Sequence, residues 1–179
     1  VLAERLPQGI RSPNDEVQAL LTRVGEALAF THPDTVHGAL KPSNILILPA
    51  GLVITDFCLA LGLEREAYTA GHRHRRLPTR YLAPEYLAGR QVDHRADLYS
   101  LAVIAFELLS GIPYPGDRDR AAAAIDDLHP AARGTLLETL SRSPGERPDH
   151  VDDLLDGVLA AVIEGTPTGP HAMVGDSTN

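Results

Sequence analysis

Apolar side chains recur at helical spacing in two parts of the chain. Between Pro13 and Phe30, and again from Val151 to Val162, they lie three or four residues apart, which is typical of amphipathic helices. Ser12 precedes the first stripe and suits an N-cap, with Pro13 in the first turn. The stripes consist of Val17, Leu20, Leu21, Val24 and Leu28, and of Val151, Leu154, Leu155, Val158, Leu159 and Val162. The pattern therefore predicts one helix over residues 13–30 and another at the end of the folded chain.

Short β-branched runs and one long apolar run fill the middle of the chain. Residues 45–48 and 52–55 flank the turn-forming Pro49-Ala50-Gly51, and this arrangement predicts a compact β-hairpin. Residues 97–110 are apolar on most sides and are followed by Gly111, which predicts a buried central helix. One more amphipathic helix is expected between it and the last one. The predicted fold class is mainly α, with a small β-hairpin (α+β overall).

Two segments lack any hydrophobic periodicity. Residues 64–79 are polar, which predicts an exposed loop. Residues 164–179 are rich in Gly, Pro, Thr and Ser, which predicts a disordered tail or a linker. The folded domain is accordingly expected to span residues 1–163.

Length and composition fit one globular domain, with 179 residues, 44% hydrophobic and 22% charged. Sixteen Lys and Arg against 24 Asp and Glu give a net charge of 16 − 24 = −8, which argues against a general nucleic-acid or anionic-membrane binder. The apolar run from Leu101 to Leu109 is far shorter than the ~20 residues that a membrane span needs. The single cysteine, Cys58, permits no intramolecular disulfide, and a cytoplasmic location is expected.

Four short motifs follow one another in a specific order. They are His37-Gly38-Ala39-Leu40-Lys41-Pro42-Ser43-Asn44, Asp56-Phe57-Cys58, Ala83-Pro84-Glu85 and Arg95-Ala96-Asp97-Leu98-Tyr99-Ser100. With a helix before them and a hairpin between the first two, they resemble the C-terminal lobe of eukaryotic-like Ser/Thr protein kinases of the bacterial type. The resemblance covers about residues 2–162 and implies a protein-kinase-like C-lobe, with the N-lobe outside this chain.

Several positions match residues that hold the kinase lobe together. The resemblance implies that Asp97 anchors the backbone of the catalytic loop, which contains His37, and that Phe57 is the aromatic residue of the metal-binding motif. Glu85 and Arg147 match the partners of the family's buried ion pair. A bidentate contact between arginine and carboxylate suits burial, because either charge alone would be costly to bury. We therefore predict a buried salt bridge between Glu85 and Arg147.

One position needed for phosphoryl transfer differs from the family. An aspartate of the catalytic loop accepts the proton of the substrate hydroxyl in these enzymes, and Ala39 stands at its place. A methyl group cannot accept a proton, and loss of a general base typically costs ~10²–10⁴-fold in rate. Gly38 replaces the arginine that pairs with a phosphorylated activation loop. The resemblance thus implies a pseudokinase without an intact catalytic base.

Other positions that carry the chemistry are retained. Asn44 and Asp56 match the side chains that hold magnesium, and Lys41 matches the lysine that steadies the transferring phosphoryl group. Leu46 matches the floor of the adenine pocket. Residues before His37 contain neither a Gly-rich phosphate loop nor a lysine. Binding of ATP and magnesium is therefore expected to be weak or absent without an N-lobe.

A basic cluster lies in the predicted loop. Arg73, Arg75 and Arg76 stand close together within a strongly acidic chain. Such a cluster is either a solvated loop or a docking site for an acidic or phosphorylated protein partner. No nucleic-acid partner is expected.

Three functions stay open from the sequence. The first is a pseudokinase that acts as a regulatory or scaffolding module, with residual Mg-nucleotide binding if an N-lobe lies upstream. The second is an active or weakly active Ser/Thr kinase that transfers the ATP γ-phosphate to protein hydroxyls, because positioning and charge stabilisation supply most of the catalysis in this chemistry. The third is a purely structural interaction domain. Small-molecule phosphotransferases share the His-Gly-x-Leu loop, but they also need the aspartate absent at Ala39, and Ala83-Pro84-Glu85 favours the protein-kinase branch.

Overall fold

The computed structural model describes residues 1–4, 6, 11–57 and 79–164, which form a mainly helical fold with one hairpin. Its helices are α1 (Asn14–Thr31), α4 (Pro84–Leu87), α5 (Arg95–Ser110), α6 (Arg118–Ala124), α7 (Pro130–Thr139) and α8 (Val151–Glu164). The strands are β1 (Ile45–Leu48) and β2 (Gly51–Ile54), and short 3-10 turns are η1 (Leu2–Glu4), η2 (Pro42–Asn44), η3 (Thr79–Tyr81) and η4 (Pro144–Glu146). The mainly α class with a small hairpin is the one that the sequence predicts.

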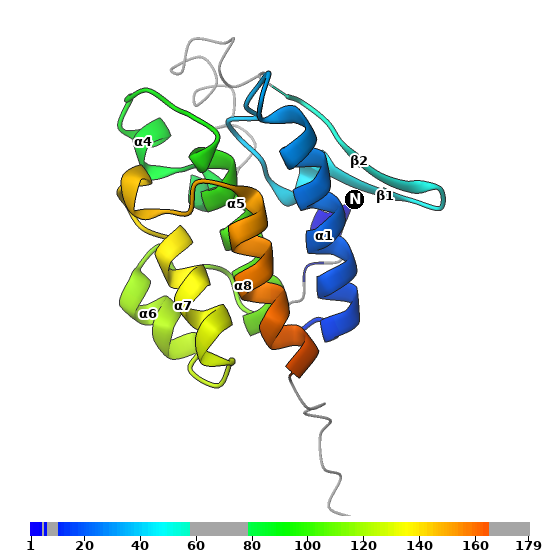
Figure 1. Ribbon diagram of the computed structural model, residues 1–179, viewed down its shortest axis with the longest axis vertical. Helices are drawn as coiled ribbons and strands as arrows, with labels where there is room; N and C mark the ends of the chain where they lie inside the picture. Colours follow the sequence, from blue (N-terminus) through cyan, green and yellow to red (C-terminus); the bar gives the residue numbers. More distant parts are fainter. Residues whose placement is uncertain (5, 7–10, 58–78, 165–179) are drawn as a thin grey trace, which may run out of the picture.

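The centre of the fold is α5. Every residue from Ala96 to Leu109 is buried, so this helix is surrounded on all sides, as its mostly apolar sequence predicts. Gly111 ends it in the left-handed conformation, with φ 74°, and its N–H donates to the carbonyl of Glu107. Helices α1, α7 and α8 pack against α5, and Figure 1 shows α1 and α8 side by side.

The start of α1 differs from the prediction. Pro13, rather than Ser12, occupies the N-cap position, and no side chain caps the helix. The carbonyl of Pro13 accepts from the Val17 N–H at 3.0 Å, so Pro13 itself begins the helical hydrogen-bond series. The N–H of Ser12 donates instead to the carbonyl of Leu108 at 3.0 Å. A tertiary contact with the end of α5 therefore replaces the predicted local cap.

Three helices follow α5 among the described residues, where the sequence predicts two. The additional one is α6, a short helix whose N-cap, Asp117, accepts from the Arg120 N–H at 2.9 Å. Its apolar residues are mostly alanines, so no stripe of large side chains announces it. Ala121 is nevertheless fully buried, and α6 packs against α7. The N-cap at Asp117 and the packing against α7 therefore stabilise α6.

The hairpin is antiparallel and has two different faces. One face packs against the core and consists of Ile45, Ile47, Leu52 and Ile54. The other carries Leu46, with Leu48 and Val53 beside it at 48% and 44% exposure. Because Ile45 pairs with Ile54, the residues just before β1 and just after β2 meet at the open end of the hairpin. This register brings two separate motifs together.

Some predictions fall outside the described residues. They concern Cys58, the basic cluster of Arg73, Arg75 and Arg76, and nearly all of the predicted tail, since α8 extends to Glu164. Within the described ranges, no helix is both long enough and apolar enough to cross a membrane.

Candidate functional site

Asn44 and Asp56 meet at the open end of the hairpin. The side-chain amide Nδ2 of Asn44 donates to Oδ2 of Asp56. The backbone holds the same place, since the Thr55 N–H donates to the Asn44 carbonyl and the Asn44 N–H to the Lys41 carbonyl, both at 2.9 Å. The two residues matched to the magnesium-binding positions are thus adjacent, although twelve residues separate them along the chain.

The side-chain oxygen of Asn44 has no hydrogen-bond partner among the described residues. Asn44 is only 3% exposed, and its Oδ1 is buried without a hydrogen bond to any described residue. A buried acceptor without a partner is unfavourable by roughly 1–3 kcal/mol, so such atoms call for a physical explanation. An amide oxygen beside a carboxylate is a donor set that suits magnesium, which takes one or two protein ligands and completes its shell with water and phosphate oxygens. The residues present therefore fit this cation.

The backbone of Asp56 is strained. Its φ is 65°, and in the described part of the chain it is the only non-glycine residue with a positive φ. Such a conformation costs roughly 1–3 kcal/mol, and strain of this kind concentrates at functional sites, although aspartate tolerates it better than most residues do. This backbone conformation places the exposed carboxylate of Asp56 against Asn44.

Lys41 lies within electrostatic reach of this pair. Burial lowers the pKa of its ammonium group, while the negative charge of Asp56 opposes that change. Lys41 is also the only lysine of the chain, where fifteen arginines supply the remaining basic groups. A half-buried cation thus stands beside the predicted magnesium ligands.

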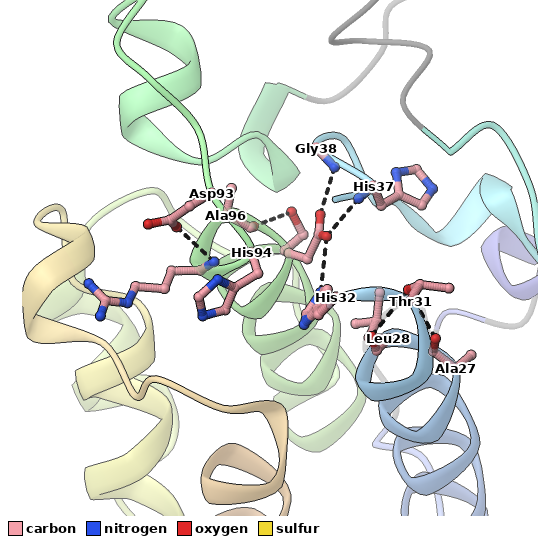
Figure 2. A network of polar contacts seen from close by, with 12 residues as sticks. Ala27, Leu28, Thr31, His32, His37, Gly38, Asp93, His94 and Ala96 are labelled. Carbon is pink, nitrogen blue, oxygen red and sulfur yellow. Dashed lines mark hydrogen bonds and ion pairs between the residues drawn. The ribbon is translucent and has the colours of Figure 1, made fainter. Parts of the chain in front are cut away.

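The loop that contains Ala39 is anchored by the buried carboxylate of Asp97. The N–H groups of His37 and Gly38 each donate to it at 2.8 Å, and the His32 ring contacts it at 3.2 Å. Figure 2 shows these three groups converging on the carboxylate from the loop and from the end of α1. Because Asp97 is fully buried in α5, the core helix fixes the loop.

The His37 ring connects the loop to the end of the hairpin. Its Nε2 lies 2.9 Å from the Thr55 carbonyl, which can only accept, so this nitrogen carries the proton. Its Nδ1 accepts from the Ala39 N–H at 3.4 Å, and the ring packs against Phe57 with 4.8 Å between centroids. Burial lowers the pKa of His37, against the opposing charge of Asp97. The neutral ring suits both hydrogen bonds.

The side chain of Ala39 lies in a small apolar cluster. It is 3% exposed and packs with Tyr86 of α4, while Leu82 and Val92 pack around them. The methyl group offers neither a proton acceptor nor a hydrogen bond. The loop position that matches the catalytic base is thus part of the packing between this loop and α4.

The predicted salt bridge between Glu85 and Arg147 is present. Two parallel hydrogen bonds of 2.7 Å join the guanidinium to the carboxylate, and both residues are almost fully buried. Arg147 also donates to the carbonyls of Ser141 and Arg95, each at 3.0 Å, and lies over the ring of Tyr99. The pair ties α4 to the start of α5 and to the segment around η4.

Two buried carboxylates, those of Asp97 and Glu107, make polar contacts that were not predicted from the sequence. His32 touches Asp97 from the end of α1, and no local pattern indicates this pairing across sixty-five positions. Glu107 accepts from Arg80 Nε at 2.5 Å, from the Tyr81 hydroxyl and from the Tyr114 N–H. A lone glutamate in a buried apolar helix signals an internal partner, and this signal was available in the sequence.

The comparisons with known proteins agree with this arrangement. The family model described as "Protein kinase domain" matches residues 1–173. Serine/threonine-protein kinase PknF of Mycobacterium tuberculosis is 34% identical, over 93% of this chain and 34% of its own length. Probable serine/threonine-protein kinase PknB of Lactococcus lactis is 33% identical, over 98% of this chain and 27% of its own. The chain thus spans about a third of these curated relatives.

Solved structures show the same relationship. One crystal structure of the M. tuberculosis PknI kinase domain matches with a TM-score of 0.66 and 27% identity, covering 89% of this chain and 60% of that one. A second crystal structure of the same kinase domain matches with a TM-score of 0.65 and 29% identity, over 89% and 59%. The fold, the order of the motifs and these relatives agree: the chain belongs to the protein kinase family.

Proposed function

We propose that the chain is the C-lobe of a pseudokinase, which keeps the residues for magnesium and phosphate, lacks the catalytic base and acts as a regulatory or scaffolding module. The observation that carries this proposal is the position of Ala39. Its methyl group packs against Tyr86 where the family has a carboxylate. No group on this side chain can accept the proton of a substrate hydroxyl.

Residual nucleotide binding is supported by the hairpin end. Asn44 and Asp56 would hold a magnesium ion, which supplies positive charge to phosphate oxygens when bound. Lys41 contributes a second positive charge beside Asp56. On the outer face of the hairpin, Leu46 offers an apolar surface for the adenine ring. All four residues act in binding rather than in accepting a proton.

The proposal includes one condition for this binding. The Gly-rich loop that covers phosphates in kinases belongs to an N-lobe, so strong binding requires that lobe upstream of Val1. Because the chain spans about a third of its curated relatives, the experiments below use the full-length protein. A cytoplasmic location and a protein partner complete the proposal.

An active kinase is the second candidate. The retained pair of Asn44 and Asp56 favours it, together with the Ser/Thr kinases among the relatives. Positioning and charge stabilisation supply most of the catalysis in phosphoryl transfer, so slow transfer without the aspartate is chemically reasonable. Only the active kinase would transfer the phosphoryl group at a measurable rate, whereas both candidates would bind nucleotide.

Calorimetric titration of the full-length protein with ATP, with and without magnesium, tests the binding part. We expect magnesium-dependent binding that Asp56→Asn weakens roughly tenfold or more, because it removes the only carboxylate of the pair. Asp34→Asn makes the same charge change at an exposed residue of the loop after α1 and should leave the affinity unchanged. Equal affinities of the two variants would contradict the role of Asp56 in binding magnesium. Only a protein that shows no magnesium-dependent binding would leave the purely structural domain as the function.

A further inference from the structure

A mainly apolar groove of about 300 Å³ lies between the first half of α1 and the core-facing side of the hairpin. We call it the α1–hairpin groove. The four residues matched to nucleotide binding are not among the described residues that line it. Leu2, Val17 and Leu108 line it with buried side chains. Three further apolar residues that line it are only half-buried, so apolar surface stays open to solvent there; they are Leu20, Ile47 and Leu52.

Opposite charges stand at the two ends of the α1 stretch that lines the groove. Glu16 and Arg23 are seven residues apart on this helix, which separates them by about 10 Å along its axis. Both side chains are exposed, and neither has a hydrogen bond or ion pair to another described residue. Ala19 and Leu20 lie between them. A segment that fits the groove therefore needs apolar side chains, with a hydrogen-bond donor at one end and a carboxylate at the other.

Helix α8 ends near the Glu16 end of the groove. It packs against α1 with Leu155 facing Gly25, and Figure 1 shows that the two helices run in opposite directions. Glu164, the last residue of α8, lies nine residues after Leu155, and Glu16 lies nine residues before Gly25. Both are therefore displaced from the contact by about 13 Å in the same direction. The chain that follows α8 thus starts beside the Glu16 end of the groove.

The sequence after α8 contains one segment with the required pattern. His171 is followed by the apolar run Ala172-Met173-Val174 and then, after one glycine, by Asp176. The other residues from 165 to 179 are Gly, Pro, Thr, Ser and Asn. The histidine supplies the hydrogen-bond donor, the run supplies the apolar side chains and the aspartate supplies the carboxylate.

The direction of the chain places these groups in the right order. Residues 165–170 reach at most ~20 Å when extended, which is enough to lead the chain from α8 past the start of α1. His171 then arrives first, at the Glu16 end. Five extended residues cover ~16 Å, so Asp176 comes within side-chain reach of Arg23, about 10 Å further along α1. Order, spacing and charge thus agree with the groove.

We propose that residues 171–176 of this chain dock in the α1–hairpin groove, with Met173 and Val174 on its apolar residues and Asp176 paired with Arg23. Because Ile47 and Leu52 belong to the hairpin, the docked segment ties the hairpin to α1. It covers apolar surface that is otherwise open to solvent, which is favourable by roughly 25 cal/mol per Å². The proposal does not rest on nucleotide binding or phosphoryl transfer, so it stands or falls separately from the proposed function.

Disulfide trapping in the full-length protein tests the proposal. Cys58→Ser, with any cysteine outside this chain replaced in the same way, gives a background without thiols. Val174→Cys is then combined with Ala19→Cys, at an exposed residue that lines the groove. The control combines Val174→Cys with Asn14→Cys, at an exposed residue of α1 that lies near the Glu16 end but does not line the groove. In a glutathione redox buffer, we expect an intramolecular disulfide that forms at least ~10-fold faster with Ala19→Cys, because docking raises the local concentration of the two thiols.

Charge reversal tests the orientation of the docked segment. Arg23→Glu and Asp176→Arg should each slow trapping at Ala19→Cys roughly threefold, because each places like charges together. The two substitutions combined should restore the rate, and added salt should reduce all these differences.

The substituted positions of α1 are exposed, so unchanged thermal unfolding will show that the variants fold. Equal trapping rates with Ala19→Cys and Asn14→Cys would overturn the proposal. So would disulfide-linked dimers in place of the intramolecular product, because the segment would then occupy the groove of a second copy. A combined charge reversal that traps as slowly as the single ones would overturn the pairing of Asp176 with Arg23.

Discussion

His37 shows how one side chain links the fold to the site. Its neutral ring donates to the Thr55 carbonyl and accepts from the Ala39 N–H, so it joins the hairpin end to the loop. Protonation would remove the acceptor at Nδ1 and place a charge in a buried position. The lowered pKa of His37, caused mainly by burial, follows from this arrangement.

The lowered pKa of His37 predicts that the folded protein becomes less stable at acidic pH. The folded pKa of His37 lies below the unfolded value of 6.5, so the unfolded chain binds more protons near and below that pH. Stability should therefore fall as the pH drops from about 7.5 to about 5.5. Urea unfolding across this range should show a smaller pH slope for His37→Asn than for the unmodified chain. His150→Asn, at an exposed residue, should keep the original slope. A slope unaffected by His37→Asn would contradict this assignment.

Removal of the Arg147 side chain should cause a large loss of stability. Arg147→Ala leaves the carboxylate of Glu85 buried without its partner, and breaking such a pair on one side costs ~3–5 kcal/mol. We expect the melting temperature to fall by roughly 10 °C. Arg11→Ala also removes a bidentate arginine contact, but Arg11 and Asp127 are exposed, so this variant should change stability by less than ~1 kcal/mol. Calorimetry gives the melting temperatures of both variants. Equal melting temperatures would contradict the prediction that burial makes the pair of Glu85 and Arg147 the more important one.

At the scale of elements, α7 and α8 pack closely because one residue between them is a glycine. A Cβ on Gly157 would lie 2.7 Å from Cβ and 2.8 Å from Cγ2 of Thr135, too close to be accommodated without movement of α7 or α8. Gly134 of α7 has no atom within 4 Å of the corresponding position. The same substitution should therefore have opposite effects at these two helical glycines.

The matched pair of variants makes this a direct measurement. Gly134→Ala should stabilise the fold by ~1 kcal/mol or slightly less, because alanine favours a helix over glycine. Gly157→Ala should destabilise it, because the clash exceeds that gain in propensity. Chemical unfolding of both variants gives the two signs, and stabilisation by Gly157→Ala would show that α7 and α8 are not packed as described.

Sequence patterns predict elements where local spacing decides them. The hairpin at residues 45–54 and the buried helix before Gly111 could be found this way, because β-branched runs and a mostly apolar segment carry the information. The pair of Glu85 and Arg147, sixty-two positions apart, was predicted instead from the resemblance of its motifs to the kinase family. The cap of α1 and the presence of α6 could not be predicted in this way. The start of α1 depends on a contact with a distant element, the hydrogen bond from Ser12 to Leu108, and α6 lacks a stripe of large apolar side chains.

The candidate site divides in the same way. Asn44 and Asp56 were predicted from their motifs, but their direct contact follows from the register of the hairpin, which the sequence does not specify alone. The contact of His32 with Asp97 depends on how α1 packs against α5. Tertiary packing therefore explains what sequence reasoning missed.

For the whole molecule, the core helix supports the site through a continuous chain of contacts. Asp97 of α5 holds the loop, His37 joins the loop to Thr55, and the following residue, Asp56, contacts Asn44. This support is complete even though Ala39 offers no base. Active kinases combine two properties, holding a nucleotide with magnesium and accepting the proton of a hydroxyl. In the proposed function this chain keeps residues for the first property and lacks the residue for the second.

The most direct test measures phosphoryl transfer from labelled ATP to a protein substrate by the full-length protein and three variants. We predict transfer at or below detection for the unmodified protein, and at least ~10-fold more for Ala39→Asp, because the new carboxylate supplies the missing base. Asp56→Asn added to Ala39→Asp should abolish the gain. Rapid phosphorylation by the unmodified protein that is lost in Asp56→Asn, so that a contaminating kinase is excluded, would contradict the pseudokinase assignment and identify the chain as part of an active kinase.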